Sequence, residues 1–263
     1  MQQHPLAGKT ALVCGASEGI GRASAIGLAE QGANIILLAR RPKVLDEVRN
    51  ALPCVAEGQQ HNYMMADVSD SAGLKNKLDE MLKAFKIDIL INNTAGPVGG
   101  AANTGTPEQY LAVFQQHLIA NQILLQAVLP HMKDRQWGRI VNIISTSVKE
   151  PIANLGVSNT IRGAVASWSK TLASELGPFG ITVNNVLPGY TRTQRLGQIL
   201  EERSKATNKA SEDIEAAMLS TVPAGRFAEA SEIAAAVVFL ASPQAGYING
   251  INLPVDGGRT RSL

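Results

Sequence analysis

Residues 9–21 read KTALVCGASEGIG. This stretch runs from an apolar strand pattern, TALVC, into three glycines, Gly15, Gly19 and Gly21, and then into a helical pattern. Glycines at this spacing let the backbone turn tightly and bring the N-terminus of the next helix close to a bound group. The free N–H groups and dipole of that N-terminus would stabilise a pyrophosphate. The alternative is a tight strand-to-helix turn without a ligand. Motifs elsewhere in the chain are needed to distinguish these two interpretations.

Six further apolar runs follow this stretch, each suited to a buried strand: NIILLA, YMMA, DILIN, RIVNII, ITVNNVL and INLPV. Helical patterns such as RASAIGLAEQ and GLKNKLDEMLKAF separate them. This alternation predicts an α/β fold in which parallel strands, about seven in all, are crossed by helices. Right-handed crossovers would give a Rossmann-type doubly wound sheet with helices on both faces and a ligand crevice at the strands' carboxyl ends. We expect one domain over residues 1–263.

One polar segment interrupts the alternation. Residues 193–218 read TQRLGQILEERSKATNKASEDIEAAM and follow the sixth strand. Insertions beside a crevice are often mobile covers, so this segment is predicted to be a substrate lid within the domain. A pair of solvated helices is the alternative.

Composition narrows the classes of partner. Hydrophobic residues make up 45% of the chain and charged residues 17%, which allows a large core. The net charge of +2 with scattered Lys and Arg gives no basic stripe, which argues against nucleic acid. No apolar run approaches the roughly 18 residues of a membrane span, and the N-terminus MQQHPLAGKT shows no targeting pattern. The two cysteines, Cys14 and Cys54, form neither a disulfide framework nor a metal-ligand set, so we expect a cytoplasmic protein without a metal.

Five more motifs follow the glycine turn in order: MADVSD (65–70), DILINNTAGP (88–97), GRIVNIIS (138–145), VNNVLPGYTRT (183–193) and NLPVDGG (252–258). Together they cover almost the whole chain, which resembles the short-chain dehydrogenase/reductase family. Within that family it is similar to a divergent group of β-ketoacyl-carrier-protein reductases. The resemblance implies a nicotinamide-dependent oxidoreductase that acts on a small carbonyl or hydroxyl substrate, for example a 3-oxoacyl thioester.

The resemblance also assigns the cofactor contacts. The glycine turn would hold the pyrophosphate, the next two motifs the adenosine, and the proline-glycine loop the nicotinamide carboxamide, although that loop could also be an ordinary turn. The residues implied are Gly15, Ser17, Gly19, Ile20, Gly21, Asp67, Val68, Asn93, Thr94, Pro188, Gly189, Thr191 and Thr193. The chain departs from the family at Thr94 and Ala95, where relatives usually carry Ala and Gly, and the larger residues leave less room for backbone approach.

The end of the second strand bears on the choice of cofactor. Ala39 occupies the place where an acid would bind the ribose hydroxyls of NAD, and Arg40 follows it. An Arg can bind a 2′-phosphate through two parallel hydrogen bonds, so NADP(H) is predicted in preference to NAD(H). Glu18 counts against this prediction because many NADP-binding relatives carry a basic residue there. Solvated arginines before Pro42 are the alternative.

The catalytic positions are altered. Ser145 matches the family serine that hydrogen-bonds a substrate carbonyl. Relatives carry a Tyr 13 residues later (158 − 145) and a Lys four further on (162 − 158), whereas this chain has Ser158 and Arg162. Counting back from VLPHM places His117 where relatives have an Asn at a helix bulge. The resemblance thus predicts a catalytic tetrad of His117, Ser145, Ser158 and Arg162, in which Arg162 also holds the nicotinamide ribose.

The changes remove the usual proton donor. A phenol has a pKa near 10 and can be tuned toward neutrality, but a serine hydroxyl is a far weaker acid. Loss of the general acid alone would cost about 10² to 10⁴ in rate. His117, Tyr190 and Lys149 are candidate substitutes, with a structural, a loop-packing and a surface role as their respective alternatives. Ser158 has a further alternative as a helix cap.

Three functions remain open at this point. The first is an NADP(H)-dependent oxidoreductase with this altered site. The second is a cofactor-binding protein without turnover, acting as a partner subunit or sensor, and the third is a non-redox enzyme. Two long helices, around 107–133 and 154–177, and the C-terminal YINGINLPVDGG resemble the interfaces through which relatives assemble, so a homo-oligomer, a tetramer or at least a dimer, is expected. The helices could instead pack only on their own sheet.

Overall fold

A seven-stranded parallel sheet forms the centre of the computed structural model, which describes residues 4–262. The strand order is β3-β2-β1-β4-β5-β6-β9, with the reversal of chain direction across the sheet between β1 and β4. The strands are β1 (Thr10–Cys14), β2 (Asn34–Ala39), β3 (His61–Met65), β4 (Ile89–Asn92), β5 (Gly138–Ile143), β6 (Ile181–Pro188) and β9 (Asn252–Val255). Each predicted apolar run forms one of them. The predicted doubly wound fold is confirmed.

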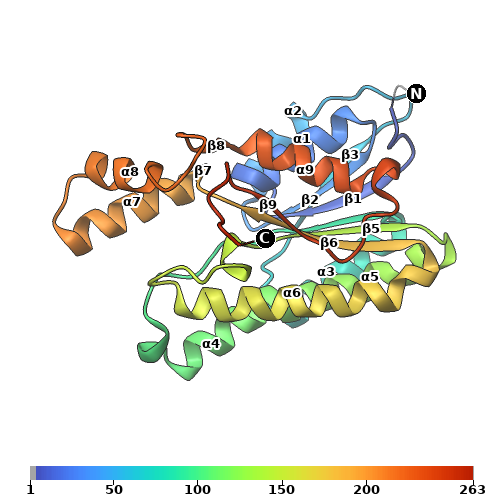
Figure 1. The fold of residues 1–263 in the computed structure, drawn as a ribbon. Coiled ribbons are helices and arrows are strands. Elements are labelled where there is room, and N and C mark those ends of the chain that lie inside the picture. The colour runs from blue at the N-terminus through green and yellow to red at the C-terminus, as the bar shows by residue number, and fades with distance from the viewer. Residues whose placement is uncertain (1–3, 263) are drawn as a thin grey trace.

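Helices cover both faces of this sheet (Figure 1). One face carries α1 (Gly19–Glu30), α2 (Pro42–Ala51) and α9 (Ala230–Ala241); the other carries α3 (Ser71–Ala84), α4 (Pro107–Phe114), α5 (Ala120–Asp134) and α6 (Gly156–Leu176). Side chains alternate along β1: Val13 packs into the core beneath α1 and α9, and Leu12 into the core beneath α3, α5 and α6. Short 3-10 turns occur at Ala102–Thr104, Thr146–Val148, Gly177–Phe179 and Pro243–Ala245.

The predicted long helix over 107–133 is interrupted. A π-helical turn, η2 (Gln115–Ile119), joins α4 to α5. A π-turn inserts one extra residue into the helix and so redirects the side chains around it. Here it buries His117, which is 2% exposed.

The polar insertion folds as a helical hairpin beside the sheet. Its helices are α7 (Gln194–Thr207) and α8 (Ser211–Leu219), flanked by a two-stranded parallel ribbon of β7 (Thr191–Arg192) and β8 (Ala228–Glu229). The pair, drawn in orange, projects from one end of the three-layer body (Figure 1). Leu196, Ile214, Met218 and Phe227 form a small core of its own. The insertion is therefore a structured unit with a small apolar core.

Within residues 4–262, no helix has the length and apolarity that a membrane crossing requires. The same part of the chain contains no group of three or more His, Cys, Asp or Glu side chains arranged to hold a metal ion.

Candidate active site

A cavity of about 660 Å³ lies at the carboxyl ends of the central strands, at the point where the strand order reverses. Crevices at this position bind ligands in doubly wound sheets. All the predicted motifs except the last contribute to its wall. The predicted residues that line it are Gly15, Ser17, Gly19, Ile20, Arg40, Asp67, Val68, Asn93, Thr94, Ser145, Ser158, Arg162, Pro188, Gly189, Thr191 and Thr193. Gly21 and His117, which were also predicted, lie behind the lining.

The glycine turn forms a cradle that side chains would fill. Gly15 and Gly19 have φ angles of +59° and +56°, which favour glycine. A Cβ added to Gly15 would lie 2.7 Å from the Asn93 carbonyl oxygen, and one added to Gly19 would lie 3.3 Å from Thr193 Cγ2. The bare backbone at the start of α1 thus faces the cavity, as the binding of a pyrophosphate requires.

Gly21 has a different role from the other two glycines. A Cβ there would lie 2.2 Å from the Gly15 carbonyl oxygen. Gly21 therefore allows α1 to pack tightly against the end of β1 and does not face a ligand. The three glycines, with the Asn93 amide donating to Cys14 and Gly15 carbonyls at 3.4 Å, fit a dinucleotide.

Charged side chains gather at the end of the cavity next to β2. Arg40 is exposed and lines the wall, and its charge, after two hydrogen bonds from Ser69, helps to hold the pKa of Asp67 below its ordinary value. Arg41 is already paired: its Nη2 donates to Glu18 Oε2 at 2.6 Å and to Ser17 Oγ at 3.2 Å. Glu18 therefore competes with any incoming phosphate for Arg41.

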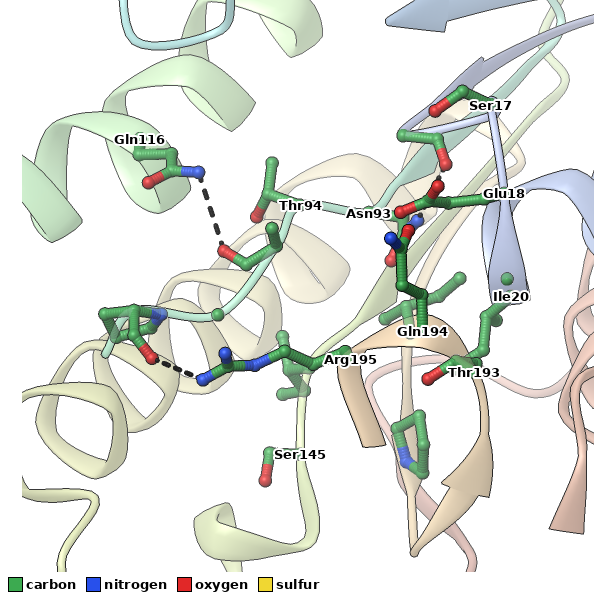
Figure 2. A pocket seen from close by; sticks show the side chains of 18 of the residues that line it. Ser17, Glu18, Ile20, Asn93, Thr94, Gln116, Ser145, Thr193, Gln194 and Arg195 are labelled. Carbon is green, nitrogen blue, oxygen red and sulfur yellow. Dashed lines mark hydrogen bonds between the residues drawn. The ribbon is translucent and has the colours of Figure 1, made fainter. Parts of the chain in front are cut away.

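Glu18 also contacts the helical hairpin. With its amide oriented so that both groups are satisfied, Gln194 donates from its side-chain nitrogen to Glu18 Oε2 at 2.9 Å. Figure 2 shows Gln194 directed toward Glu18. The first turn of α7 is thereby tied to the glycine turn.

Ser145 lies at the opposite end of the cavity, directly after β5. Its Oγ accepts a hydrogen bond from the Ser147 backbone N–H at 3.1 Å. This contact fixes the oxygen and leaves the hydroxyl hydrogen free to donate into the cavity. Ser145 lines the cavity, and its catalytic role remains a prediction.

Arg162 is a buried cation, and no acidic side chain of residues 4–262 pairs with it. It is 7% exposed, and its guanidinium donates to the carbonyls of Ile143 (3.1 Å) and Thr94 (3.4 Å), while Nε has no partner. Burial lowers its pKa to about 10, so it keeps its charge at neutral pH. The site therefore contains a positive charge that the surrounding protein does not neutralise.

His117 does not reach the cavity. Its Nδ1 contacts Thr94 Oγ1 at 2.5 Å, and its Nε2 is buried without a partner. Burial, and then the charge of Arg162, lower its pKa to about 2. A neutral imidazole behind Thr94 cannot serve as the substitute acid at neutral pH, which corrects that expectation; the residue instead supports Thr94.

Ser158 and the other two candidate donors differ in position. Ser158 is the third residue of α6, whose N-cap is Leu155 without a side-chain cap bond, so Ser158 lines the cavity and does not cap the helix. Tyr190 also lines the cavity; its ring packs edge-on against Phe227 with centroids 5.9 Å apart and under Arg259 at 4.7 Å. Lys149 is not part of the lining.

The sequence did not single out Arg195, which crosses the cavity from the first turn of α7. Its Nη2 donates to the Pro97 carbonyl at 3.0 Å, and its Nη1 lies 3.3 Å from Glu202 Oε1. In Figure 2 it extends away from Gln194, in the region above Ser145. The only sequence signal was its place in the segment predicted as a lid.

The strand order, the crevice and the glycine cradle define a dinucleotide-binding protein of the doubly wound α/β class. Comparisons with known proteins identify the family of this protein. Residues 15–260 match the family model described as enoyl-(acyl carrier protein) reductase. The chain is 31% identical over 258 residues to the NADPH-dependent reductase BacG of Bacillus subtilis (97% of this chain, 99% of that one). It is 36% identical over 254 residues to the 3-oxoacyl-[acyl-carrier-protein] reductase FabG of Haemophilus influenzae (95% and 98%).

Solved structures agree with these relatives. The structure of YwfH, an NADPH-dependent reductase involved in bacilysin biosynthesis, superposes with a TM-score of 0.90 at 30% identity (97% of this chain, 99% of that one). L-sorbose reductase from Gluconobacter frateurii, complexed with NADPH and L-sorbose, gives 0.91 at 28% identity over all of both chains. This protein belongs to the short-chain dehydrogenase/reductase family. The predicted family and enzyme class, an oxidoreductase of carbonyl or hydroxyl groups, are confirmed at that level.

Proposed function

We propose that the protein is an NADP(H)-dependent reductase of a small carbonyl compound, working through an altered catalytic site. One observation carries this proposal: a single cavity joins the bare glycine cradle and Arg40 at one end to Ser145 and the buried, uncompensated Arg162 at the other. Relatives named or solved as NADPH-dependent support the choice of cofactor.

The residues that would hold NADP(H) follow from the lining. Gly15, Gly19 and the start of α1 would face the pyrophosphate, and Arg40 the 2′-phosphate. The nicotinamide carboxamide would be held by Pro188, Gly189, Thr191 and Thr193. Arg162 would lie beside the nicotinamide ribose. When bound, NADPH supplies the hydride that reduces the substrate carbonyl carbon.

The chain's own residues then stabilise the charge that develops on the substrate oxygen. Ser145 donates its free hydroxyl hydrogen to that oxygen, and Arg162 supplies a fixed positive charge in a site of low dielectric constant. Tyr190 is the one of the three candidate donors that lines the cavity, so we assign it the proton transfer, with Ser158 holding the substrate or a water.

Turnover and cofactor affinity test this proposal separately. NADPH oxidation is followed with acetoacetyl-CoA and a panel of small ketones, in the wild type and in Ser145→Ala and Tyr190→Phe. Each substitution is expected to lower kcat by about 10² or more with little change in NADPH affinity. Arg40→Met is expected to weaken NADPH about 10- to 100-fold and leave NADH unchanged. Tight NADPH binding with no turnover of any ketone would instead favour the partner-subunit or sensor function.

A second candidate reaction is favoured by the description of the matching family model, an enoyl reductase. If the hydride adds to the β-carbon of a conjugated C=C–C=O group, the carbonyl oxygen becomes an enolate, which is much less basic than an alkoxide. Ser145 and Arg162 can stabilise an enolate without a strong acid, and water then protonates the α-carbon. Crotonyl-CoA turned over faster than acetoacetyl-CoA would establish this reaction.

We also propose that the hairpin of α7 and α8 is the substrate lid. Four residues of α7 line the cavity, which supports this role: Gln194, Arg195, Leu196 and Ile199.

We further propose that the protein is a homo-oligomer. Exposed apolar side chains support this assembly: Leu111 on α4 is 68% exposed, and Tyr247, in the predicted C-terminal interface, is fully exposed. Sedimentation as a monomer at micromolar concentration would contradict the oligomer.

A further inference from the structure

We propose that the substrate carries a carboxylate, and that Arg195 of α7 binds it. This inference rests on the proposed function and adds the chemical class of the substrate: an oxo acid, with its carbonyl at Ser145 and its acid group under the lid.

The current partners of Arg195 are weak. Nη2 holds a neutral backbone carbonyl at 3.0 Å, and Nη1 is 3.3 Å from Glu202 Oε1 and 3.4 Å from Gln198 Oε1. The side chains of Arg195 and Glu202 are 32% and 46% exposed, and a pair so accessible to water contributes little. A carboxylate inside the cavity can accept two parallel hydrogen bonds from the guanidinium and would be preferred.

The location of Pro97 places Arg195 at the catalytic end. The loop that carries Pro97 continues to Gly100, which donates from its N–H to Asn154 at 2.7 Å and accepts from Gly156 N–H at 2.8 Å. Gly156 begins α6, the helix that carries Ser158 and Arg162. Arg195 therefore crosses from the lid to the catalytic wall.

The distribution of charge in the cavity supports an anion at this end. Arg195 and Arg162 line it, whereas the two carboxylates of the lining, Glu18 and Asp67, lie at the adenosine end. Glu18 is bound to Arg41, and Asp67 to Ser69. An anionic substrate would thus meet two positive charges, and the carboxylate beside Arg195, that of Glu202, lies outside the lining.

The cofactor pyrophosphate is the other anion that Arg195 could bind, and the geometry favours the substrate. The pyrophosphate belongs at the start of α1, on the wall that Gln194 faces, and Arg195 points the other way (Figure 2). Leu155, Leu196 and Ile199 also line the cavity and give it apolar surface for the hydrocarbon part of such a substrate. The site is therefore matched to an oxo acid with a small hydrocarbon body.

The experiment compares acids with their neutral esters. The probes are 2-oxo and 4-oxo acids of four to eight carbons, each with its methyl ester, titrated by calorimetry into the wild-type enzyme–NADP⁺ complex and tested for NADPH oxidation. At least one acid is expected to bind ten times more tightly than its ester. Arg195→Met should weaken that acid about 10- to 100-fold and change its ester less than twofold, and Arg195→Lys should fall between. Arg192→Met removes a neighbouring charge that pairs with Glu229 outside the lining and should leave both unchanged.

Separate readings distinguish the possible failures. If esters bind as tightly as acids, or no acid binds the complex, the inference is overturned while the proposed function can stand. If Arg195→Met weakens NADPH more than tenfold and preserves the preference for acids, Arg195 is a cofactor residue and the inference is wrong. If wild-type protein binds no NADPH, the proposed function itself fails.

Discussion

The two ends of the cavity are built in different ways. At the adenosine end, main-chain groups form the binding surface. Gly15 and Gly19 have left-handed conformations that leave the start of α1 free of side chains, and Gly21 allows α1 to pack closely against β1. At the catalytic end, side chains form the binding surface. Ser145, Ser158 and Arg162 line a wall formed by the end of β5 and the start of α6.

This difference determines which residues of the cavity can be substituted without loss of its shape. A site of this kind tolerates few substitutions: an added Cβ at Gly15 or Gly21 would strike a main-chain atom, and Gly19 has a left-handed φ that favours glycine. A side-chain site can be rewritten while its frame stays the same. Here the π-turn, the turn after β5 and the first turns of α6 are all present. The family resemblance predicts that three of the four catalytic residues on these elements differ from the family pattern.

The largest expected effect comes from the backbone site. Gly21→Ala places a Cβ 2.2 Å from the Gly15 carbonyl, so α1 must shift away from β1. We expect NADPH affinity to fall more than 100-fold and unfolding free energy to fall by about 2 kcal/mol. In the control Gly197→Ala, an α7 glycine has open space around its Cβ position, and stability should rise slightly. Calorimetry and chemical denaturation measure both quantities; equal behaviour of the two variants would contradict the account.

The side-chain site should be restorable. Ser158 lines the cavity and is only half-buried, so Ser158→Tyr combined with Arg162→Lys would supply the phenol and the ammonium of the family pattern. In the Tyr190→Phe background, which lacks the proposed donor, ketone reduction is expected to rise about 10²- to 10⁴-fold, the contribution of a general acid. Ser158→Phe with Arg162→Lys adds the same bulk without the hydroxyl and should show no gain. An unchanged rate in the tyrosine variant would mean that the frame no longer presents the substrate to position 158.

Acid stability tests the neutral state of His117. In the folded protein its pKa is about 2, whereas in the unfolded chain it is near 6.5. Between these values only the unfolded chain binds the proton, so lowering the pH favours unfolding. Relative to His117→Asn, the wild type should lose about 2 kcal/mol more between pH 7 and pH 5. Parallel stability curves for the two proteins would show that the imidazole is not held neutral.

The smallest expected effect concerns Glu18. Its carboxylate occupies Arg41 and would repel a 2′-phosphate nearby. Glu18→Gln should tighten NADPH binding about three- to tenfold and leave NADH almost unchanged, and the gain should shrink at high salt because the groups are exposed. A gain of the same size for NADH would exclude the phosphate as its cause.

The sequence predicts features that depend on local chemistry better than contacts between distant segments. Strand runs such as TALVC and NIILLA, and the glycine spacing after the first of them, depend on local chemistry, and each formed as predicted. The contacts between Arg195 and Pro97, and between Gln194 and Glu18, join segments about 100 residues or more apart. Their pairing depends on where the inserted hairpin docks, which no periodicity encodes. His117 was placed in register, but its separation from the cavity depends on the π-turn and on Thr94, and these appear only in three dimensions.

The most direct test of the central claim, an intact cofactor end beside a rewritten catalytic end, is a calorimetric titration of the wild type and of the Ser158→Tyr, Arg162→Lys variant with NADPH and NADH. Both proteins are expected to bind NADPH at least ten times more tightly than NADH, with NADPH affinities within about threefold of each other. NADPH binding that is absent in the wild type, or that appears only in the restored variant, would contradict this claim.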